Sequence, residues 1–148
     1  MKFHVVRSEP GYVKLSDGST IISRVMITNI REQAFKPTGP DFLVSYRVSF
    51  SVDAPDSLRD VVKTKPLPPP DASHISKLDI WEIVNITESK KSLEECLCKA
   101  SDNREYIISA EIEATIIART LEYKDEFGNP IYFVRWSPKV TIRLKEIP

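Results

Sequence analysis

Cysteine, glycine and glutamine are scarce in this chain, and two of these shortages exclude a class of structure. Two cysteines in 148 residues exclude a disulfide framework. With four glycines, the chain contains neither G-x-x-x-x-G-K-[ST] nor G-x-G-x-x-G, so neither nucleotide-binding motif is present. Glutamine occurs only at Gln33, while lysine, glutamate and proline are plentiful, a composition that resembles proteins of thermophiles.

Net charge and long apolar runs are also absent. Lys and Arg number 21 and so do Asp and Glu, which removes a general electrostatic attraction to nucleic acid or to anionic lipid. No apolar run approaches the roughly 20 residues of a membrane helix, and residues 1–7 do not resemble a signal peptide. We therefore expect a cytoplasmic protein that does not interact with membranes.

What the sequence does contain is two-residue periodicity. From Tyr106 to Ala118 the even-numbered residues are apolar or small, and most of the odd-numbered ones are polar. The same alternation runs from Phe42 to Val52, with apolar side chains at the even positions. Period two is typical of a strand with one buried face, so both segments predict half-buried strands. A strand as long as the first is expected to bend or bulge near its middle.

Shorter signals complete the predicted order of elements. Strands are expected at 3–7, 12–15, 20–30, 78–87, 131–136 and 139–146, with a turn at Asp17-Gly18, a loop at 31–40 and a break at Pro138. Ser57 is expected to cap one short helix. Ser92 and Glu95 form a capping-box pattern that predicts a second helix, with Leu93, Cys96, Leu97 and Ala100 on one face.

These elements predict one mainly β domain over residues 1–148, a β-rich α+β fold. We expect an antiparallel β-sandwich, or a curled barrel-like sheet, of about eight strands with two short helices. Parallel βαβ units are not expected, because the helices do not alternate with the strands. A Pro-rich connecting loop at 64–76 is the one segment that resembles a linker.

Catalytic and metal-binding patterns are weak. His4, His74, Cys96 and Cys98 are the only soft metal ligands, and a Cys-x-Cys pair on a helix points its sulfurs apart, so no metal and no cofactor are predicted. Glu111 and Glu113 would lie about 7 Å apart on one strand face, where charge pairing explains them better than glycosidase chemistry. An enzyme assembled from scattered residues is the third hypothesis.

The segment 127–145 carries the clearest ligand-binding pattern. It holds basic residues and aromatic residues and contains no acidic residue. Such sheets bind single-stranded RNA or DNA through phosphate contacts and base stacking. The candidate residues are Tyr132, Arg135, Trp136, Lys139, Arg143 and Lys145, unless Glu111, Glu113 and Glu122 neutralise them.

A non-catalytic role is the function that the sequence favours. We expect a binding or scaffolding protein that acts through protein–protein contact or self-association, with single-stranded nucleic-acid binding as the alternative. The strands at 3–7 and 139–146 are the expected sheet edges, and unpaired edges favour a homodimer.

Overall fold

The structure, a computed structural model, describes residues 1–69 and 78–145. Nine strands make up most of this part of the chain: β1 (Phe3–Glu9), β2 (Gly11–Leu15), β3 (Thr20–Lys36), β4 (Gly39–Asp53), β5 (Glu82–Val84), β6 (Ile86–Lys90), β7 (Ser92–Lys99), β8 (Glu105–Lys124) and β9 (Pro130–Leu144). One α-helix, α1 (Asp56–Val62), and one 3-10 helix (Leu78–Ile80) are the helical elements among the described residues. Residues 70–77, which include most of the predicted Pro-rich loop and His74, lie outside the described ranges.

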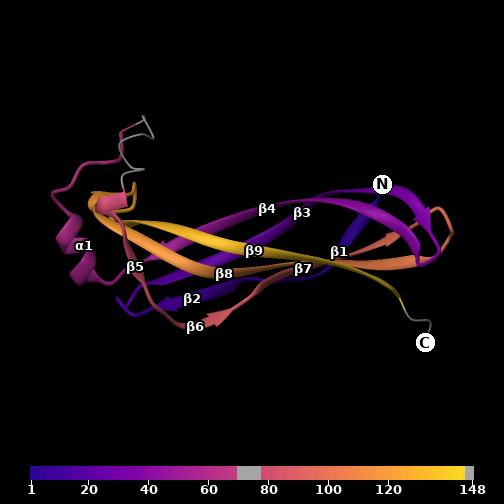
Figure 1. Cartoon of the computed structure of the whole chain (residues 1–148), viewed down its shortest axis with the longest axis horizontal. Helices are drawn as coiled ribbons and strands as arrows, with labels where there is room; N and C mark the ends of the chain where they lie inside the picture. The colour runs from indigo at the N-terminus through magenta and orange to yellow at the C-terminus, as the bar shows by residue number, and fades with distance from the viewer. Residues whose placement is uncertain (70–77, 146–148) are drawn as a thin grey trace.

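The strands form two antiparallel sheets. Sheet A contains β1, β7, β8 and β5 in that order, and β9 pairs along the other side of β8; sheet B has the order β4, β3, β2, β6. The two long hairpins, β3–β4 and β8–β9, follow the long axis of the molecule, and α1 lies at one end (Figure 1). The β-rich, antiparallel, two-layer architecture expected from the sequence is thus confirmed.

The expected irregularity in the long strand is present and changes which residues are buried. The register of β8 against β9 shifts between Ala114 and Ile116, which inserts one residue. Ile108, Ala110 and Ile112 face the core before the shift, and Ile117 does so after it. Ile116 is therefore exposed, although its parity predicts a core position.

The predicted inner face of β4 is confirmed. Phe42 is buried, and Val44, Tyr46, Val48, Phe50 and Val52 are each half-buried on the same side. The intervening side chains, from Leu43 to Ser51, are exposed.

The predicted second helix is wrong, because Ser92–Lys99 is the strand β7. It pairs with β1 on one side and β8 on the other, so its backbone hydrogen bonds go to neighbouring strands. A helix of about eight residues is marginal in isolation, and tertiary pairing decides such short segments. Cys96 and Cys98 consequently share one buried face instead of pointing apart.

Two expected breaks are absent, and one predicted strand is broken. The predicted loop 31–40 is the far end of the β3–β4 hairpin, in which β3 ends at Lys36 and β4 begins at Gly39 with φ +118°. β9 continues through Pro138, which an edge strand tolerates. The single strand predicted for 78–87 is wrong: Leu78–Ile80 is the 3-10 helix, and two strands follow, since the chain leaves sheet A after Val84 and enters sheet B at Ile86.

The predicted helix after residue 55 is present, but Ser57 does not cap it. α1 begins at Asp56, Pro55 occupies the N-cap position, and no side-chain hydrogen bond caps the helix.

The two sheets differ in width over the half of the molecule that contains the β3–β4 turn. There sheet A is four strands wide, with β1, β7, β8 and β9 side by side. Sheet B contains only β3 and β4 beyond Ser23, because β2 pairs with β3 no further than that residue. Since β3 packs mainly against β7 and β8, the inner faces of the outer strands of sheet A are less covered.

Candidate binding surface on the open side of the sandwich

The candidate nucleic-acid residues of β9 are divided between its two faces. Tyr132 and Trp136 point inward: the Tyr132 hydroxyl lies 2.7 Å from Ser19 Oγ, and Trp136 packs against the core. Arg135, Lys139, Arg143 and Lys145 have the opposite parity and lie on the outer face. The structure therefore does not bring the predicted stacking residues together with the predicted phosphate-binding residues.

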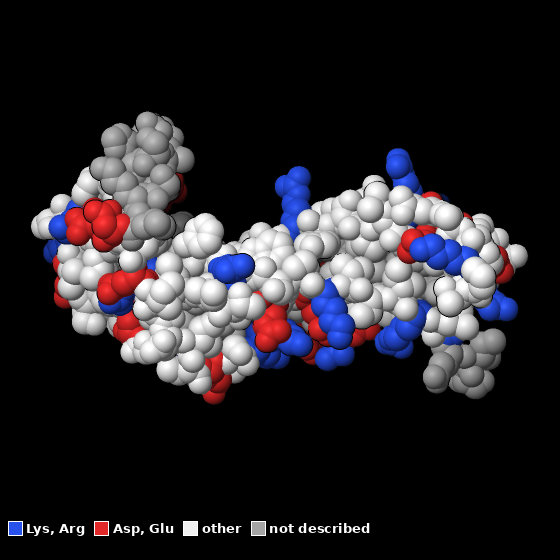
Figure 2. Space-filling model, viewed as in Figure 1, with Lys and Arg blue, Asp and Glu red and all other residues white. Residues whose placement is uncertain are grey.

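Ion pairs reduce the charge of that outer face, although the partners differ from those expected. Arg143 Nη2 lies 3.2 Å from Glu95 Oε2, and Lys145 Nζ lies 3.2 Å from Glu105 Oε2. Glu111 and Glu113 instead contact Lys91, and Glu122 contacts Lys65. Within the described residues, Arg135 and Lys139 form no ion pair. Figure 2 shows basic and acidic groups intermingled on the face that it presents.

The aspartate of the β2–β3 turn joins the two sheets. Asp17 Oδ2 accepts hydrogen bonds from Arg119 Nη1 and from the Tyr132 hydroxyl, both at 2.7 Å. Burial would raise the pKa of Asp17, but hydrogen bonds from Tyr132, the Ser19 amide and Arg119 outweigh it, so the pKa lies below its usual value. Burial raises the pKa of Tyr132, and the neighbouring Asp17 adds to this effect. The polar groups of Asp17, Arg119 and Tyr132 all have hydrogen-bond partners, so we assign this network a structural role and not a catalytic one.

Cys96 and Cys98 are both buried free thiols. Burial raises the pKa of Cys96 to about 11, with Glu94 adding to the shift, so its thiol stays protonated at neutral pH. Among the residues that the structure covers, no group of three His, Cys, Asp or Glu side chains is placed to hold a metal ion. In the same ranges, none of the helices has the length and apolar character needed to cross a membrane.

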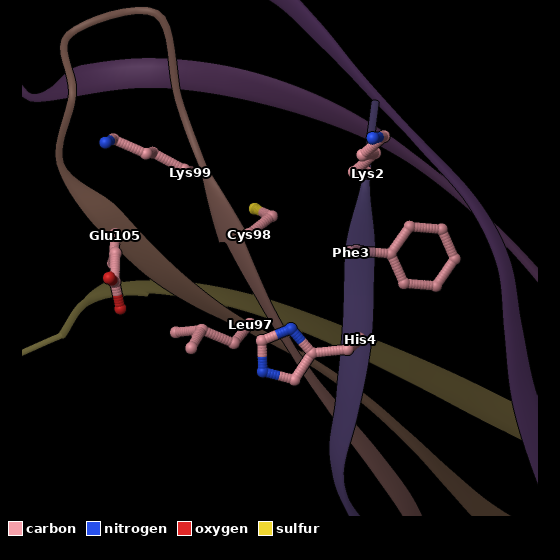
Figure 3. Close-up of a pocket in the computed structure, with 7 residues that line it drawn as sticks. All are labelled: Lys2, Phe3, His4, Leu97, Cys98, Lys99 and Glu105. Carbon is pink, nitrogen blue, oxygen red and sulfur yellow. The ribbon is translucent and has the colours of Figure 1, made fainter.

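A shallow hollow of about 210 Å³ surrounds His4 at the start of β1. Figure 3 shows Lys2 just before β1, His4 on β1, and Leu97, Cys98, Lys99 and Glu105 on the strands beside it. The Glu105 carboxylate is engaged by Lys145, and the Cys98 thiol is buried. The hollow therefore contains no nucleophile paired with a base.

The open side of the sandwich lies between the outer edges of β4 and β9. Cross-strand register places Val140, Ile142 and Leu144 on the inner face of β9, beside core residues of β8. Their side chains nevertheless remain 40%, 37% and 46% exposed, because sheet B ends at β4. The inner row of apolar side chains on β9 is thus only partly covered, because no strand of sheet B lies beyond β4.

A second hollow, of about 450 Å³, continues this side at the end of the molecule. Its walls come from the β3–β4 turn, the β7–β8 turn and the last residues of β9. The Tyr106 hydroxyl donates to Asp102 Oδ2 at 2.8 Å, and Phe35, Ile142 and Leu144 supply apolar surface.

The outer face of the β3–β4 hairpin carries three arginines, Arg24, Arg31 and Arg47, which we call the arginine face. All three are exposed. Arg24 pairs in register with Ser49 and Arg31 with Leu43, so no acidic side chain lies directly opposite either one. Within the described part of the chain none of the three forms an ion pair or a side-chain hydrogen bond. This face was not predicted from the sequence. One signal could have indicated it, because Arg47 is the only charged residue from Phe42 to Val52.

Comparisons with known proteins give no further information. No protein-family model, no curated protein sequence and no solved structure matches this chain.

Proposed function

We propose that this protein is a non-catalytic binding protein that acts by contact with another protein chain along its open side. The observation that supports the proposal best is the partly exposed inner row of β9. Apolar side chains that face a missing layer are stabilised when another chain supplies that layer, because burial removes their surface from water. Two buried free cysteines are consistent with a role in the reducing cytoplasm.

Hydrogen-bonding geometry supports the same role. β4 and β9 are both edge strands, so each presents unpaired backbone groups along the open side. Addition of a strand to such an edge is a general mode of protein recognition. Self-association is one form of this contact, and the sequence-based homodimer stays a prediction.

The proposal is tested by placing a photo-reactive amino acid at Leu43, which is exposed on β4, in the cells that express the protein. The matched control places it at Ser89 on β6, the opposite edge of sheet B. We expect protein adducts from position 43 and few from position 89. Equal yields at the two positions, or adducts with nucleic acid alone, would contradict the proposal.

Single-stranded nucleic-acid binding is the second candidate, favoured by one specific observation. Phe133 is 63% exposed and shares the outer face of β9 with Arg135 and Lys139. In this arrangement Phe133, and not Tyr132 or Trp136, would stack on a base.

A further inference from the structure

The free edge of β4 is limited at both ends by specific groups. Beyond Val52 the side chain of Asn129 occupies it: Nδ2 donates to Val52 O, and Oδ1 accepts from the Ala54 amide, both at 3.3 Å. At the other end Pro40 has no amide hydrogen to offer. Beside Pro40, Asp41 Oδ1 accepts the Phe42 amide at 3.1 Å, which occupies the edge there as well. Residues 43–50 remain available for pairing.

The direction of the backbone groups follows from the same contact. Val52 O points to Asn129 and away from β3, and backbone direction alternates along an antiparallel strand. The even-numbered residues of β4 therefore direct their N–H and C=O groups at the free edge. The odd-numbered residues direct theirs at β3.

The edge of β4 lacks the features that usually protect a free strand. From 42 to 50 it has no proline, no lysine and no inward-pointing charge, and the extra residues at both register shifts with β3 lie in β3. The other edges differ: β9 contains Pro138 and Lys139, β1 is irregular between Val5 and Arg7, and β6 and β5 span only five and three residues. Of the edges in the described ranges, β4 is the one suited to accept a long strand.

A strand added there would supply the missing cover. Because β3 packs over β7 and β8 and β4 reaches β9, the next position in sheet B lies on the β9 side. An added strand would extend sheet B toward Val140, Ile142 and Leu144. Its inward side chains should therefore be apolar.

The arginine face determines which outward side chains an added strand should carry. Residues directly opposite on neighbouring strands interact, and opposite charges stabilise such a pair. Of the outward residues of β4 that would adjoin an added strand, Arg47 is the charged one and Leu43, Ser45 and Ser49 are uncharged. Arg24 and Arg31 lie one strand further, on β3. A second copy of this chain would instead bring three more arginines to the same face, which is unfavourable.

We propose that the free edge of β4 accepts, as an added antiparallel strand, an extended segment of a partner protein whose side chains alternate between apolar and acidic. This inference rests on the proposed function, because it names the partner chemistry of the same open side.

A synthetic probe tests the proposal on the full chain. The probe is a fluorescent peptide of about nine residues that alternates valine and glutamate. One control peptide replaces glutamate with lysine, and another has the same composition with the valines grouped together. We expect saturable binding of the alternating glutamate peptide, at least about ten-fold tighter than either control, because the charge pair with Arg47, the nearby Arg24 and Arg31, and the alternation all contribute.

A charge-reversal variant tests whether the peptide binds beside Arg47 on the arginine face. Arg47→Glu should weaken binding of the glutamate peptide by between about two-fold and about thirty-fold, and should strengthen binding of the lysine peptide. Arg135→Glu, at another exposed arginine that lies on the outer face of β9, makes the same change in charge; it is the matched control and should leave both affinities unchanged. Equal effects of the two variants would overturn the assignment to β4.

Hydrogen exchange reports the backbone pairing without any substitution. On addition of the glutamate peptide, the amides of Val44, Tyr46 and Val48 should gain protection. Those of Ser45 and Arg47, already bonded to β3, should change little. Protection without this alternation would overturn strand addition.

The outcomes separate this proposal from the proposed function. If no peptide binds and Leu43 still yields adducts with another protein, the general role survives and the alternating acidic segment is wrong. Adducts with a second copy of this chain would show that the partner is the protein itself, and the inference of an acidic partner segment would be wrong. Tighter binding of single-stranded RNA than of the glutamate peptide to the arginine face would overturn the inference.

Discussion

One inserted residue decides which isoleucine of β8 reaches the core. Ile116 and Ile117 are neighbours of identical chemistry, yet Ile116 is 40% exposed and Ile117 is fully buried. Ile117→Ala should lower the free energy of unfolding by about 2–5 kcal/mol, because it leaves a cavity. Ile116→Ala should cost less than about 1 kcal/mol. Urea denaturation of both variants measures the difference, and similar losses would mean that the bulge is misplaced.

The Asp17 carboxylate predicts a pH dependence of stability. Its pKa is lower in the folded chain than in the unfolded chain, so its contribution is complete above the unfolded value, about 3.9, and declines as pH falls through the lower folded value. Asp17→Asn should lower the free energy of unfolding by about 1.5–3 kcal/mol at pH 7, the range for hydrogen bonds to a charged group.

The same variant contains its own control. As pH falls below about 4, Asp17 becomes protonated in the unfolded chain before it does so in the folded chain, so the difference in stability between wild type and Asp17→Asn should shrink. Urea denaturation at pH 7 and pH 3 tests this. A difference that stays constant between the two pH values would contradict the assigned ionic role.

At the scale of elements, β7 shows how far a local pattern can be trusted. Ser92, Glu94, Cys96 and Cys98 share one strand face, while the same segment also fits a helix through Leu93, Cys96, Leu97 and Ala100. Both patterns are present in the sequence, so periodicity alone does not choose between them. The choice comes from β1 and β8, which flank the segment, and from Glu94, which accepts the Ile27 amide of β3 at 2.8 Å.

The division of β9 into two faces gives a prediction for nucleic acid. Only Arg135 and Lys139 lack ion-pair partners among the basic residues of the candidate set in the described ranges, so RNA binding by β9 would have a slope near −1.4 in log K against log salt, at about 0.7 per phosphate. We expect no binding by this strand in a low-salt titration of fluorescent single-stranded RNA. Binding that is lost in Phe133→Ala, with that slope, would establish the second candidate function instead.

At the scale of the whole molecule, stability should come from the two apolar clusters between the sheets. One cluster joins β3 and β4 to β7 and β8, and the other joins β2 and β3 to β5 and β8. A chain of this length buries enough surface to fold without staples. A chelator together with a reductant should therefore leave the melting temperature unchanged in differential scanning calorimetry. A fall of many degrees would revive a site that uses His4, His74, Cys96 and Cys98.

Local residue patterns were sufficient to predict the class of the fold and the inner faces of the two long strands. Period-two alternation is a local property, and the even positions of Phe42–Val52 and of Tyr106–Ala114 are buried or half-buried as that alternation predicts. The Asp17-Gly18 pair also predicted a turn, which the structure contains. Gly18 adopts φ +89° there, which glycine does without a steric penalty.

Other features could not be predicted from local patterns, because they depend on which strands become neighbours. Pairing with distant segments causes three of these features. It reverses the buried parity of β8 at Ile116, makes residues 92–99 a strand, and moves the chain from sheet A to sheet B between residues 82 and 90. The candidate binding surface has the same origin. The alternation of β4 and β9 gives both strands an apolar inner face, but sheet order alone leaves one side of β4 unpaired and the inner row of β9 uncovered.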